Sequence, residues 1–223
     1  MSDMSSPDAR LLAVAGFVRG DYPCDVGTDH AILPIYLCKT GKASRAIASD
    51  VNRGPLLSAE KNIRAQGLSE RIVTVCSDGL EKLSGYSPTD IIIAGMGGIL
   101  ISEILAASEM SKRAHLVLQP MSHAHILRGF LTENGYTTDG EAIAEESGKI
   151  YQIISASYTG KTEKYTQAEL YLGKKNIADR EKNQLLFGKL LDRLISTFGK
   201  KVRGGDTSAE AMYEELLALK GEK

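Results

Sequence analysis

Two aspartates flank a glycine within residues 24–30 (CDVGTDH), a spacing that could hold a ligand. A short apolar run precedes Gly27, and Ala31, Leu33 and Leu37 follow it at helical spacing, so a strand, a tight turn and a helix are predicted. In a doubly wound sheet a nucleotide-like ligand binds at this first turn, because helix N-terminal amides meet the carboxyl end of the first strand there. The turn is therefore the first candidate for a cofactor site.

The charge of this turn favours one kind of cofactor. A dinucleotide fingerprint needs Gly-x-Gly-x-x-Gly, whereas the positions two and five residues after Gly27 are Asp29 and Ile32. The carboxylates of Asp25 and Asp29 disfavour a pyrophosphate and favour the cationic end of S-adenosylmethionine, an ammonium beside a sulfonium. A plain tight turn explains this stretch equally well when it is taken alone, so the downstream residues have to decide.

Two further aspartates follow predicted strands. Residues 46–50 are typical of a buried strand ending in an acid, and Asp50 lies close to the separation of about 20 residues from the turn at which an acid binds a ribose diol. Residues 72–76 predict the next strand, and Asp78 behind it can accept a hydrogen bond from an adenine amino group. The alternatives are a helix cap for Asp50 and a simple turn residue for Asp78.

A parallel sheet is needed to bring these residues together. Residues 90–94 form a continuous apolar run, as expected for a central strand buried on both faces, and a glycine-rich motif, residues 95–98 (GMGG), follows. Residues 115–118 predict a fifth strand, and residues 136–144 and 150–157 an antiparallel hairpin. Helices are predicted near residues 9–18, 31–37, 54–66, 98–107 and 121–134. Five strands alternating with helices, followed by a strand pair, predict the α/β fold of a class I methyltransferase, a Rossmann-like doubly wound sheet.

Beyond Tyr158 the pattern becomes wholly helical. Two apolar stripes, at residues 186–198 and 212–219, predict a pair of antiparallel helices separated by two glycines. We therefore expect a cofactor-binding catalytic domain over residues 1–159 and a helical, coiled-coil-like domain over residues 160–223. Basic residues on or near these helices either contact RNA or form a solvated surface: Lys174, Lys175, Lys189, Arg193, Lys200, Lys201 and Arg203.

Composition limits the other possibilities. The net charge is −1, but residues 1–159 hold 14 Lys and Arg against 18 Asp and Glu, while residues 160–223 hold 13 against 10, which is compatible with RNA binding by the tail. The three cysteines include no Cys-x-x-Cys pair, so neither a disulfide framework nor a zinc site is expected. The N-terminus has no signal-peptide pattern, and glycines interrupt the longest apolar run, so we expect a cytoplasmic protein outside the membrane.

The combination of motifs resembles the bacterial tRNA (adenine-N1) methyltransferase family that modifies adenosine 22 of tRNA. The resemblance rests on residues 25–34 (DVGTDHAILP), 93–98 (IAGMGG) and 118–120 (LQP) together with the two-helix tail, and it covers essentially the whole chain. It implies S-adenosylmethionine as cofactor, tRNA as partner, a Rossmann-like domain and a helical domain that helps to hold tRNA. One departure is Met121, which stands where the family frequently has asparagine.

The site residues follow from the turn, the acids and the resemblance. We expect Asp29 and His30 to be catalytic, and we expect no metal, because His123 and His125 are two residues apart and lie on different faces of a helix. His30 could instead be a helix N-terminal residue satisfied by backbone. The expected substrate contacts are Gln119, Arg10, Lys174, Lys175, Lys200, Lys201 and Arg203. The expected cofactor contacts are Asp25, Gly27, Thr28, Asp29, Asp50, Val51, Asp78, Gly79, Gly95, Met96 and Gly97.

The glycine-rich motif also bears on the reaction. Methyltransferases that act on exocyclic amines usually carry a polar residue after the fourth strand, but residues 94–98 offer no carboxylate or amide side chain. Adenine N1 needs less help, because its in-plane lone pair is already a nucleophile, and the base has to be unpaired or extruded to expose it. Two other functions stay open: a small-molecule or protein methyltransferase, and a non-catalytic S-adenosylmethionine-binding RNA-binding protein. The oligomeric state also stays open, with a monomer favoured.

Overall fold

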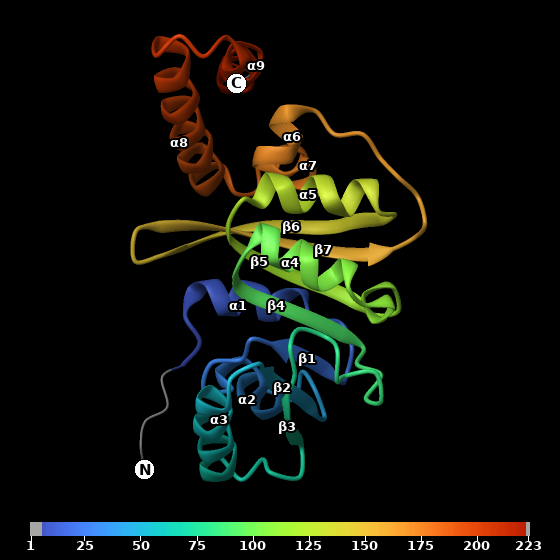
Figure 1. The fold of residues 1–223 in the computed structure, drawn as a ribbon. Helices are drawn as coiled ribbons and strands as arrows, with labels where there is room; N and C mark the ends of the chain where they lie inside the picture. Colours follow the sequence, from blue (N-terminus) through green and yellow to red (C-terminus); the bar gives the residue numbers. More distant parts are fainter. Residues whose placement is uncertain (1–5, 222–223) are drawn as a thin grey trace.

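The fold is a seven-stranded mixed sheet with helices on both faces and a helical tail at one end (Figure 1). The computed structural model describes residues 6–221; residues 1–5, part of the stretch expected to lack a signal peptide, and residues 222–223 lie outside it. The strand order is β3-β2-β1-β4-β5-β7-β6, and only β7 runs antiparallel to its neighbours β5 and β6. The strands are β1 (Pro23–Val26), β2 (Ala46–Asp50), β3 (Ile72–Cys76), β4 (Asp90–Gly97), β5 (His115–Ser122), β6 (Tyr136–Glu146) and β7 (Lys149–Tyr158). The predicted α/β layout, with five parallel strands and a final hairpin, is confirmed.

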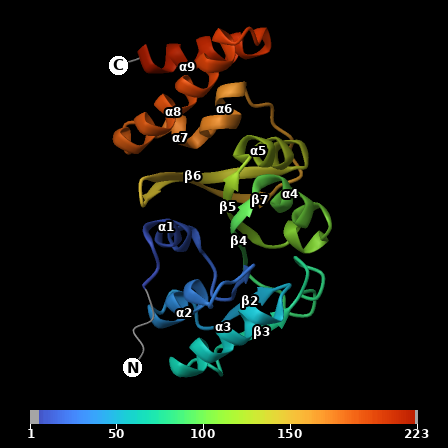
Figure 2. The ribbon, with the colours of Figure 1, turned by 60° about the vertical axis from the view of Figure 1, so that its left-hand side comes forward.

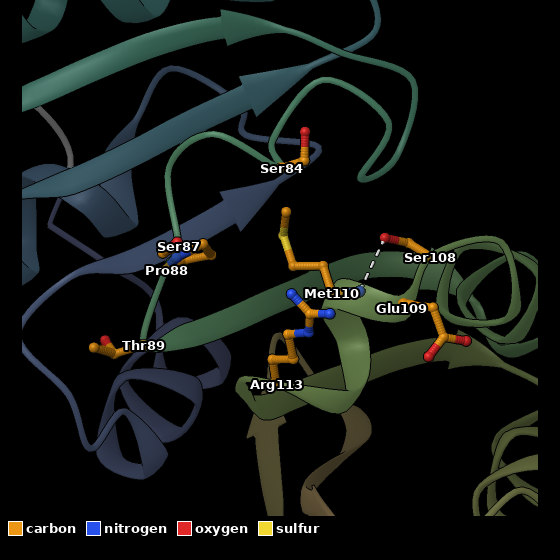
Figure 3. Close-up of a pocket in the computed structure, with 8 residues that line it drawn as sticks. All are labelled: Ser84, Ser87, Pro88, Thr89, Ser108, Glu109, Met110 and Arg113. Atoms are coloured by element: carbon orange, nitrogen blue, oxygen red, sulfur yellow. Dashed lines mark hydrogen bonds between the residues drawn. The ribbon is translucent and has the colours of Figure 1, made fainter.

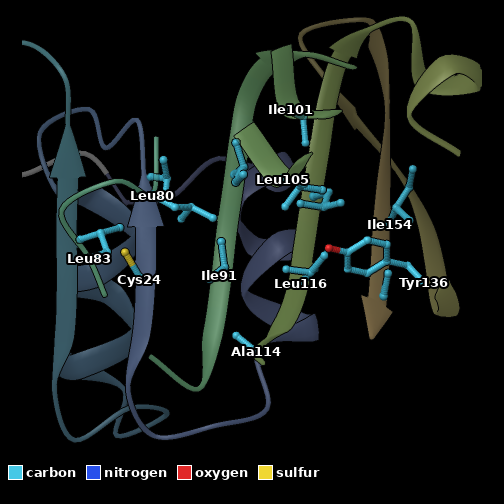
Figure 4. Packing of buried hydrophobic residues seen from close by; sticks show 14 of the residues in the cluster. Cys24, Leu80, Leu83, Ile91, Ile101, Leu105, Ala114, Leu116, Tyr136 and Ile154 are labelled. Carbon is cyan, nitrogen blue, oxygen red and sulfur yellow. The ribbon is translucent and has the colours of Figure 1, made fainter. Parts of the chain in front are cut away.

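Helices cover the two faces of the sheet because the central strands are apolar on both. In β4, Ile91 and Ile93 pack toward α4 (Gly98–Ala106) and α5 (Ala124–Glu133). Figure 4 shows residues of this cluster, among them Ile91, Leu105 and Ile101. Ile92 faces the opposite cluster, which includes residues of α1 (Ala9–Phe17) and α2 (Ile32–Lys39). The helix α3 (Arg53–Ala65) packs on the same side as α2, beside β2. A run of β-branched residues is therefore what a strand covered on both faces requires.

One connection between parallel strands contains no helix, and none is predicted there from the sequence. Between β3 and β4, residues 77–89 form turns and no helix. Gly79, Gly85 and Pro88 punctuate this segment, and the left-handed Gly79 and Ser87 cannot extend a helix. Leu80 and Leu83 still bury their side chains against the sheet, so the segment covers the core without helical structure.

The glycine-rich motif continues the strand before the helix begins. β4 runs to Gly97 rather than ending at residue 94, and α4 starts at Gly98. The register of β4 against β5 shifts between Ala94 and Met96, where Gly95 has a φ of 89°. Such a bulge bends the strand and turns its backbone toward the carboxyl edge of the sheet, which is where ligands of doubly wound folds bind.

Between residues 160 and 221, the tail contains four α-helices rather than the predicted two. The predicted helical pair is present as α8 (Gln184–Arg203) and α9 (Glu210–Gly221), which pack together with the 3₁₀ turn η2 (Thr207–Ala209). Two short helices precede it, α6 (Gln167–Leu172) and α7 (Lys174–Ala178), and a further 3₁₀ turn, η1 (Glu109–Lys112), follows α4. The apolar stripe of α8 shares a cluster with Ile143 and Ile150 of the β6–β7 hairpin, so the tail rests on the sheet as well as on itself (Figure 2).

A buried ion pair ties the tail to the sheet. The Arg128 guanidinium on α5 donates to Glu141 Oε1 on β6 at 2.7 Å, and neither side chain is exposed. Arg128 also donates to the Leu170 carbonyl at the end of α6 at 2.8 Å, while Glu141 Oε2 accepts from the Lys175 amide at the start of α7 at 2.9 Å. A side chain at Gly173 would collide with the Glu141 carboxylate. The ion pair therefore anchors α6 and α7, the first helices of the tail, to the sheet.

Among residues 6–221, no helix is both long and apolar enough to cross a membrane. All three cysteines are free: Cys24 and Cys38 are buried and Cys76 is exposed.

Candidate active site

The turn after β1 is closely packed on the glycine-rich motif. The amides of Gly27 and Thr28 both donate to the Ser49 carbonyl of β2 at 2.8 Å, which bends the chain across the end of the sheet. Gly27 has a φ of 76°, and a Cβ at this position would collide with the Met96 methyl group. Two segments that lie far apart in the sequence, both predicted to bind cofactor, are thereby brought together at the carboxyl ends of β1 and β4.

Asp25 is a buried carboxyl group at this edge. Burial raises the pKa of Asp25 to about 6, because removal from water disfavours the carboxylate. The Thr28 side chain and the positive charge of Arg10 lower this pKa, and the negative charge of Asp50 raises it. A cationic ligand at the site would favour the ionised form, so Asp25 can change its charge state close to neutral pH.

The segment that carries Asp29 and His30 is strained. His30 and Ala31 have φ values of 57° and 55°, a left-handed conformation that side chains other than glycine rarely adopt twice in succession. The Asn62 side-chain amide donates to the His30 carbonyl at 3.0 Å and holds it in place. Asp29 Oδ1 lies 3.1 Å from His30 Nε2, and the two side chains are 79% and 52% exposed. The pair is thus presented to solvent beside the cofactor turn, where a substrate could reach it.

Asp50 and Asp78 follow adjacent strands. Asp50 pairs in register with Cys76, the last residue of β3, so both acids lie at the same edge of the sheet. One Asp50 oxygen accepts from the Asn52 amide at 2.7 Å. Val51 is 55% exposed, and Gly79 turns the chain with a φ of 49° against Ile104. These positions offer two carboxylate acceptors and an apolar contact, a set that suits the hydroxyls, amino group and ring of a nucleoside.

Gln119, expected from the sequence to contact the substrate, is buried. Its side chain is fully buried, and Oε1 accepts from Arg10 Nη1 at 2.8 Å and from the Gly95 amide at 3.2 Å, while Nε2 donates to the Pro120 carbonyl at 3.0 Å. The glutamine therefore positions Arg10 and the bulged Gly95. The sequence contains the residues of this network but no local pattern that links α1 to them.

The basic residues of the tail lie away from the turn. Figure 1 shows α8 and α9 at the opposite end of the molecule from α2 and α3. Lys200, Lys201 and Arg203 are exposed at the end of α8, and Lys201 also lies 5.1 Å from the centre of the Phe198 ring. Lys174 differs from them because it is paired with Glu163. Lys175 is exposed at the start of α7.

A pocket also lies at the amino edge of the sheet, opposite the edge at which a cofactor would bind. The pocket in Figure 3 has a volume of about 480 Å³ and is lined by residues that precede β4 and β5, among them Thr89, Glu109 and Arg113. Ligands of doubly wound sheets bind at the carboxyl ends of the strands, so the cofactor site and this pocket are distinct. Within residues 6–221, no three His, Cys, Asp or Glu side chains are grouped in a way that could hold a metal ion.

The residues at the carboxyl edge fit S-adenosylmethionine better than a phosphate-bearing cofactor. Asp25, Asp29 and Asp50 supply three carboxylates, and the positive φ of Gly27 favours glycine at the turn, where its backbone can approach a ligand closely. The Ser49 hydroxyl at the end of β2 is buried without a hydrogen-bond partner in the protein, so a polar group remains to be satisfied there.

The comparisons with known proteins all point to the same family. The model of the tRNA (adenine(22)-N(1))-methyltransferase family matches residues 23–215, from β1 into α9. The Bacillus subtilis (strain 168) tRNA (adenine(22)-N(1))-methyltransferase is 38% identical over 167 residues, which are 74% of this chain and 70% of that protein. The structure of Streptococcus pneumoniae Sp1610 in complex with S-adenosyl-L-methionine matches with 30% identity and a TM-score of 0.84, over 94% of this chain and 97% of that one. The structure of M. capricolum TrmK with S-adenosyl-homocysteine matches with 26% identity and a TM-score of 0.77, over 96% and 94% of the two chains.

Proposed function

This chain belongs to the tRNA (adenine(22)-N(1))-methyltransferase family, and on that premise we propose how its own residues transfer a methyl group from S-adenosylmethionine to N1 of an adenosine in tRNA. The observation that carries the proposal is the contact of the acidic turn after β1 with the glycine-rich end of β4. When bound, the cofactor supplies the methyl group as an electrophile. The residues then have to orient the two reactants and to stabilise the charge that develops.

We propose that the carboxyl edge of the sheet holds the cofactor along its length. Asp50 accepts hydrogen bonds from the ribose hydroxyls, and Asp78 accepts one from the adenine amino group, with Val51 and Gly79 against the adenine ring. Asp25 and Asp29 attract the cationic end of the cofactor, and the backbone of Gly27 and Thr28 approaches it closely. Gly95, Met96 and Gly97 form the wall between the cofactor and the target base.

We propose that catalysis depends mainly on position. The bound cofactor would supply its methyl group to the N1 lone pair and leave as the neutral thioether, so the residues have to align the two reactants and to accommodate a cationic adenine. No proton has to leave N1 first, in agreement with a glycine-rich motif that carries no acid or amide side chain. Asp29, with His30 beside it, stabilises the positive base or accepts a proton from its amino group after transfer.

Asp50→Ala is expected to weaken S-adenosylmethionine binding by about tenfold to a hundredfold. Hydrogen bonds to a charged group are each worth about 1.5 to 3 kcal/mol, and the variant removes the acceptor for the ribose. Isothermal titration calorimetry measures the change. Asp179→Ala, which removes an exposed aspartate of the tail, is the matched control. Unchanged affinity in a folded Asp50→Ala protein would refute the ribose role.

Cofactor affinity is expected to increase by about tenfold between pH 5 and pH 7. The pKa of Asp25 is raised to about 6, so its carboxylate, the form that attracts a cation, is mostly present only above that pH. Calorimetry over this range should show the increase, and Asp25→Asn should abolish it. A steep pH dependence that persists in Asp25→Asn would assign the titration to another group.

We propose that the tail over residues 160–223 is a helical domain, docked on the sheet, that helps to hold tRNA. Its net charge of +3 and the exposed Lys175, Lys200, Lys201 and Arg203 support this role. A cytoplasmic location follows from a tRNA substrate, and a monomer remains the predicted state.

Replacing those four basic residues with serine is expected to reduce the salt dependence of tRNA binding. The slope of log affinity against log salt falls by about 0.7 to 0.9 for each phosphate that the variant no longer neutralises. Filter binding at several salt concentrations measures the slope, and Arg113→Ser, which removes an exposed arginine at the amino edge of the sheet, serves as the control. An unchanged slope and affinity would show that the tail lysines are only a solvated surface.

The activity itself is tested by following labelled methyl groups. We expect methyl groups from labelled S-adenosylmethionine to enter unmodified tRNA, with none in protein or in metabolites. Incorporation into protein or metabolites would favour another methyltransferase class. Cofactor binding without turnover on tRNA would favour a non-catalytic RNA-binding protein.

A further inference from the structure

A cleft separates the catalytic edge of the sheet from the helical tail. Its volume is about 260 Å³, and four segments line it: the turn from β5 to α5, β7, α6 and α8. Because α8 supplies one wall, the cleft exists only when the tail is docked on the sheet. Its side chains include Tyr171 from α6 and Arg193 from α8. His123, just before α5, and His125, within it, also line the cleft, so the expectation that they lie on different faces of a helix is wrong: His123 is the residue before the helix.

The cleft begins where the glycine-rich motif ends. Ser122, which lines the cleft, pairs in register with Gly97 of β4. A Cβ at Gly98 would collide with the His123 carbonyl, so the turn into α5 is pressed against the motif. A polynucleotide with one base at the motif would therefore have its neighbouring nucleotide beside the cleft.

The aromatic residues of the cleft have two different roles. His125 stacks on Tyr171 with 4.2 Å between ring centres and 7° between planes, and Tyr171 meets the Phe198 ring edge-on at 5.1 Å. Burial, with the nearby positive charges of His123, Arg128 and Lys201, lowers the pKa of His125, so its ring is neutral at neutral pH. His123 is exposed, and its left-handed backbone, with a φ of 54°, holds the ring at 6.1 Å from His125. The stacked pair forms a fixed floor, and the exposed ring is available to a base.

The charge of the cleft favours a phosphate. Among the described residues that line it, Arg193 is exposed and none is Asp or Glu. The pocket at the amino edge of the sheet contains Glu109, and the cleft between α8 and α9 contains Glu181 and Asp192. An exposed guanidinium with no carboxylate beside it attracts the phosphates of an RNA backbone.

We propose that this cleft binds the tRNA nucleotide next to the target adenosine, with its base on the His123 ring and its phosphate against Arg193. The volume lies below the range of about 300 to 1,000 Å³ typical of sites for whole small molecules, which suits one unit of a polymer. The inference rests on the proposed function and adds to it a subsite that positions RNA rather than cofactor.

Two single substitutions test the subsite. His123→Asn removes the ring and keeps a residue type that tolerates the left-handed backbone, and Arg193→Ala removes the charge. Each is expected to raise the KM for tRNA by about fivefold to a hundredfold, the range for one stacked base, while kcat at saturating tRNA and the Kd for S-adenosylmethionine stay unchanged. Arg193→Ala should also lower the salt slope of tRNA binding by about 0.7 to 0.9. Arg193→Lys, which keeps the positive charge, should retain most of the affinity.

The controls separate this proposal from the one on which it rests. Arg113→Ala removes an exposed arginine at the opposite edge of the sheet and should change none of these quantities. An unchanged KM for tRNA in both His123→Asn and Arg193→Ala overturns the subsite, and so does an equal loss of cofactor affinity, which would indicate a structural effect. If the unsubstituted protein methylates no tRNA, the proposed function fails instead.

Discussion

Asp29→Asn is expected to reduce turnover on tRNA by about 10² to 10⁴-fold, a far larger loss than any change in the affinities for cofactor and tRNA. Groups that transfer a proton or stabilise charge in the transition state contribute that much. Asp29 is the exposed acid beside the cofactor turn, and the glycine-rich motif opposite it carries no acid of its own. Single-turnover kinetics with saturating enzyme measures the methyl-transfer step without interference from binding or product release.

His30 allows the alternative to be tested in the same assay. His30→Asn removes the imidazole 3.1 Å from Asp29 and keeps a residue type that tolerates a φ of 57°. If Asp29 acts alone, His30→Asn should be much less impaired than Asp29→Asn. Near-normal turnover in Asp29→Asn at saturating substrates would show that positioning suffices and that no side chain takes this role.

Arg128→Met is expected to lower the free energy of unfolding by about 3 to 5 kcal/mol. Removing one partner of a buried ion pair leaves the other charge uncompensated. Here the substitution leaves Glu141 without its cationic partner and the Leu170 carbonyl without the hydrogen bond from Arg128. Urea unfolding followed by circular dichroism measures the loss. The double variant Arg128→Met with Glu141→Leu should recover a large part of it, because no buried charge then remains.

An exposed ion pair provides the matched control. Lys182→Met breaks the exposed pair with Asp179 in the tail and should cost less than about 1 kcal/mol. Equal losses for Lys182→Met and Arg128→Met would contradict the role assigned to burial. The buried pair also makes deletion of residues 160–223 a poor test of the tail, since the deletion would remove the groups that satisfy Arg128 and Glu141 and uncover Ile143 and Ile150.

The elements that a local pattern determines could be predicted from the sequence. The strands at residues 46–50 and 72–76 match β2 and β3, because a short apolar run bounded by turn residues is sufficient to identify a buried strand. The glycine at position 27 and the motif at residues 95–98 were recognisable because a tight turn and a close backbone approach demand glycine.

The remaining features depend on contacts between distant segments. Nothing near Arg128 in the sequence indicates that its charge is buried against Glu141, and the contact of Arg10 with Gln119 joins residues that are 109 positions apart. The left-handed turn at His123 follows from packing against Gly98, so its ring could not be assigned to a cleft beforehand. A histidine at a strand-to-helix turn was the only signal available.

The identity of the methylated nucleoside tests the central claim most directly. Unmodified tRNA is incubated with the protein and methyl-labelled S-adenosylmethionine, digested to nucleosides and resolved by chromatography with mass spectrometry. We predict that the label is recovered as N1-methyladenosine and that it disappears when adenosine 22 of the tRNA is replaced by guanosine. Label recovered in any other nucleoside, or undiminished after that replacement, would contradict the account.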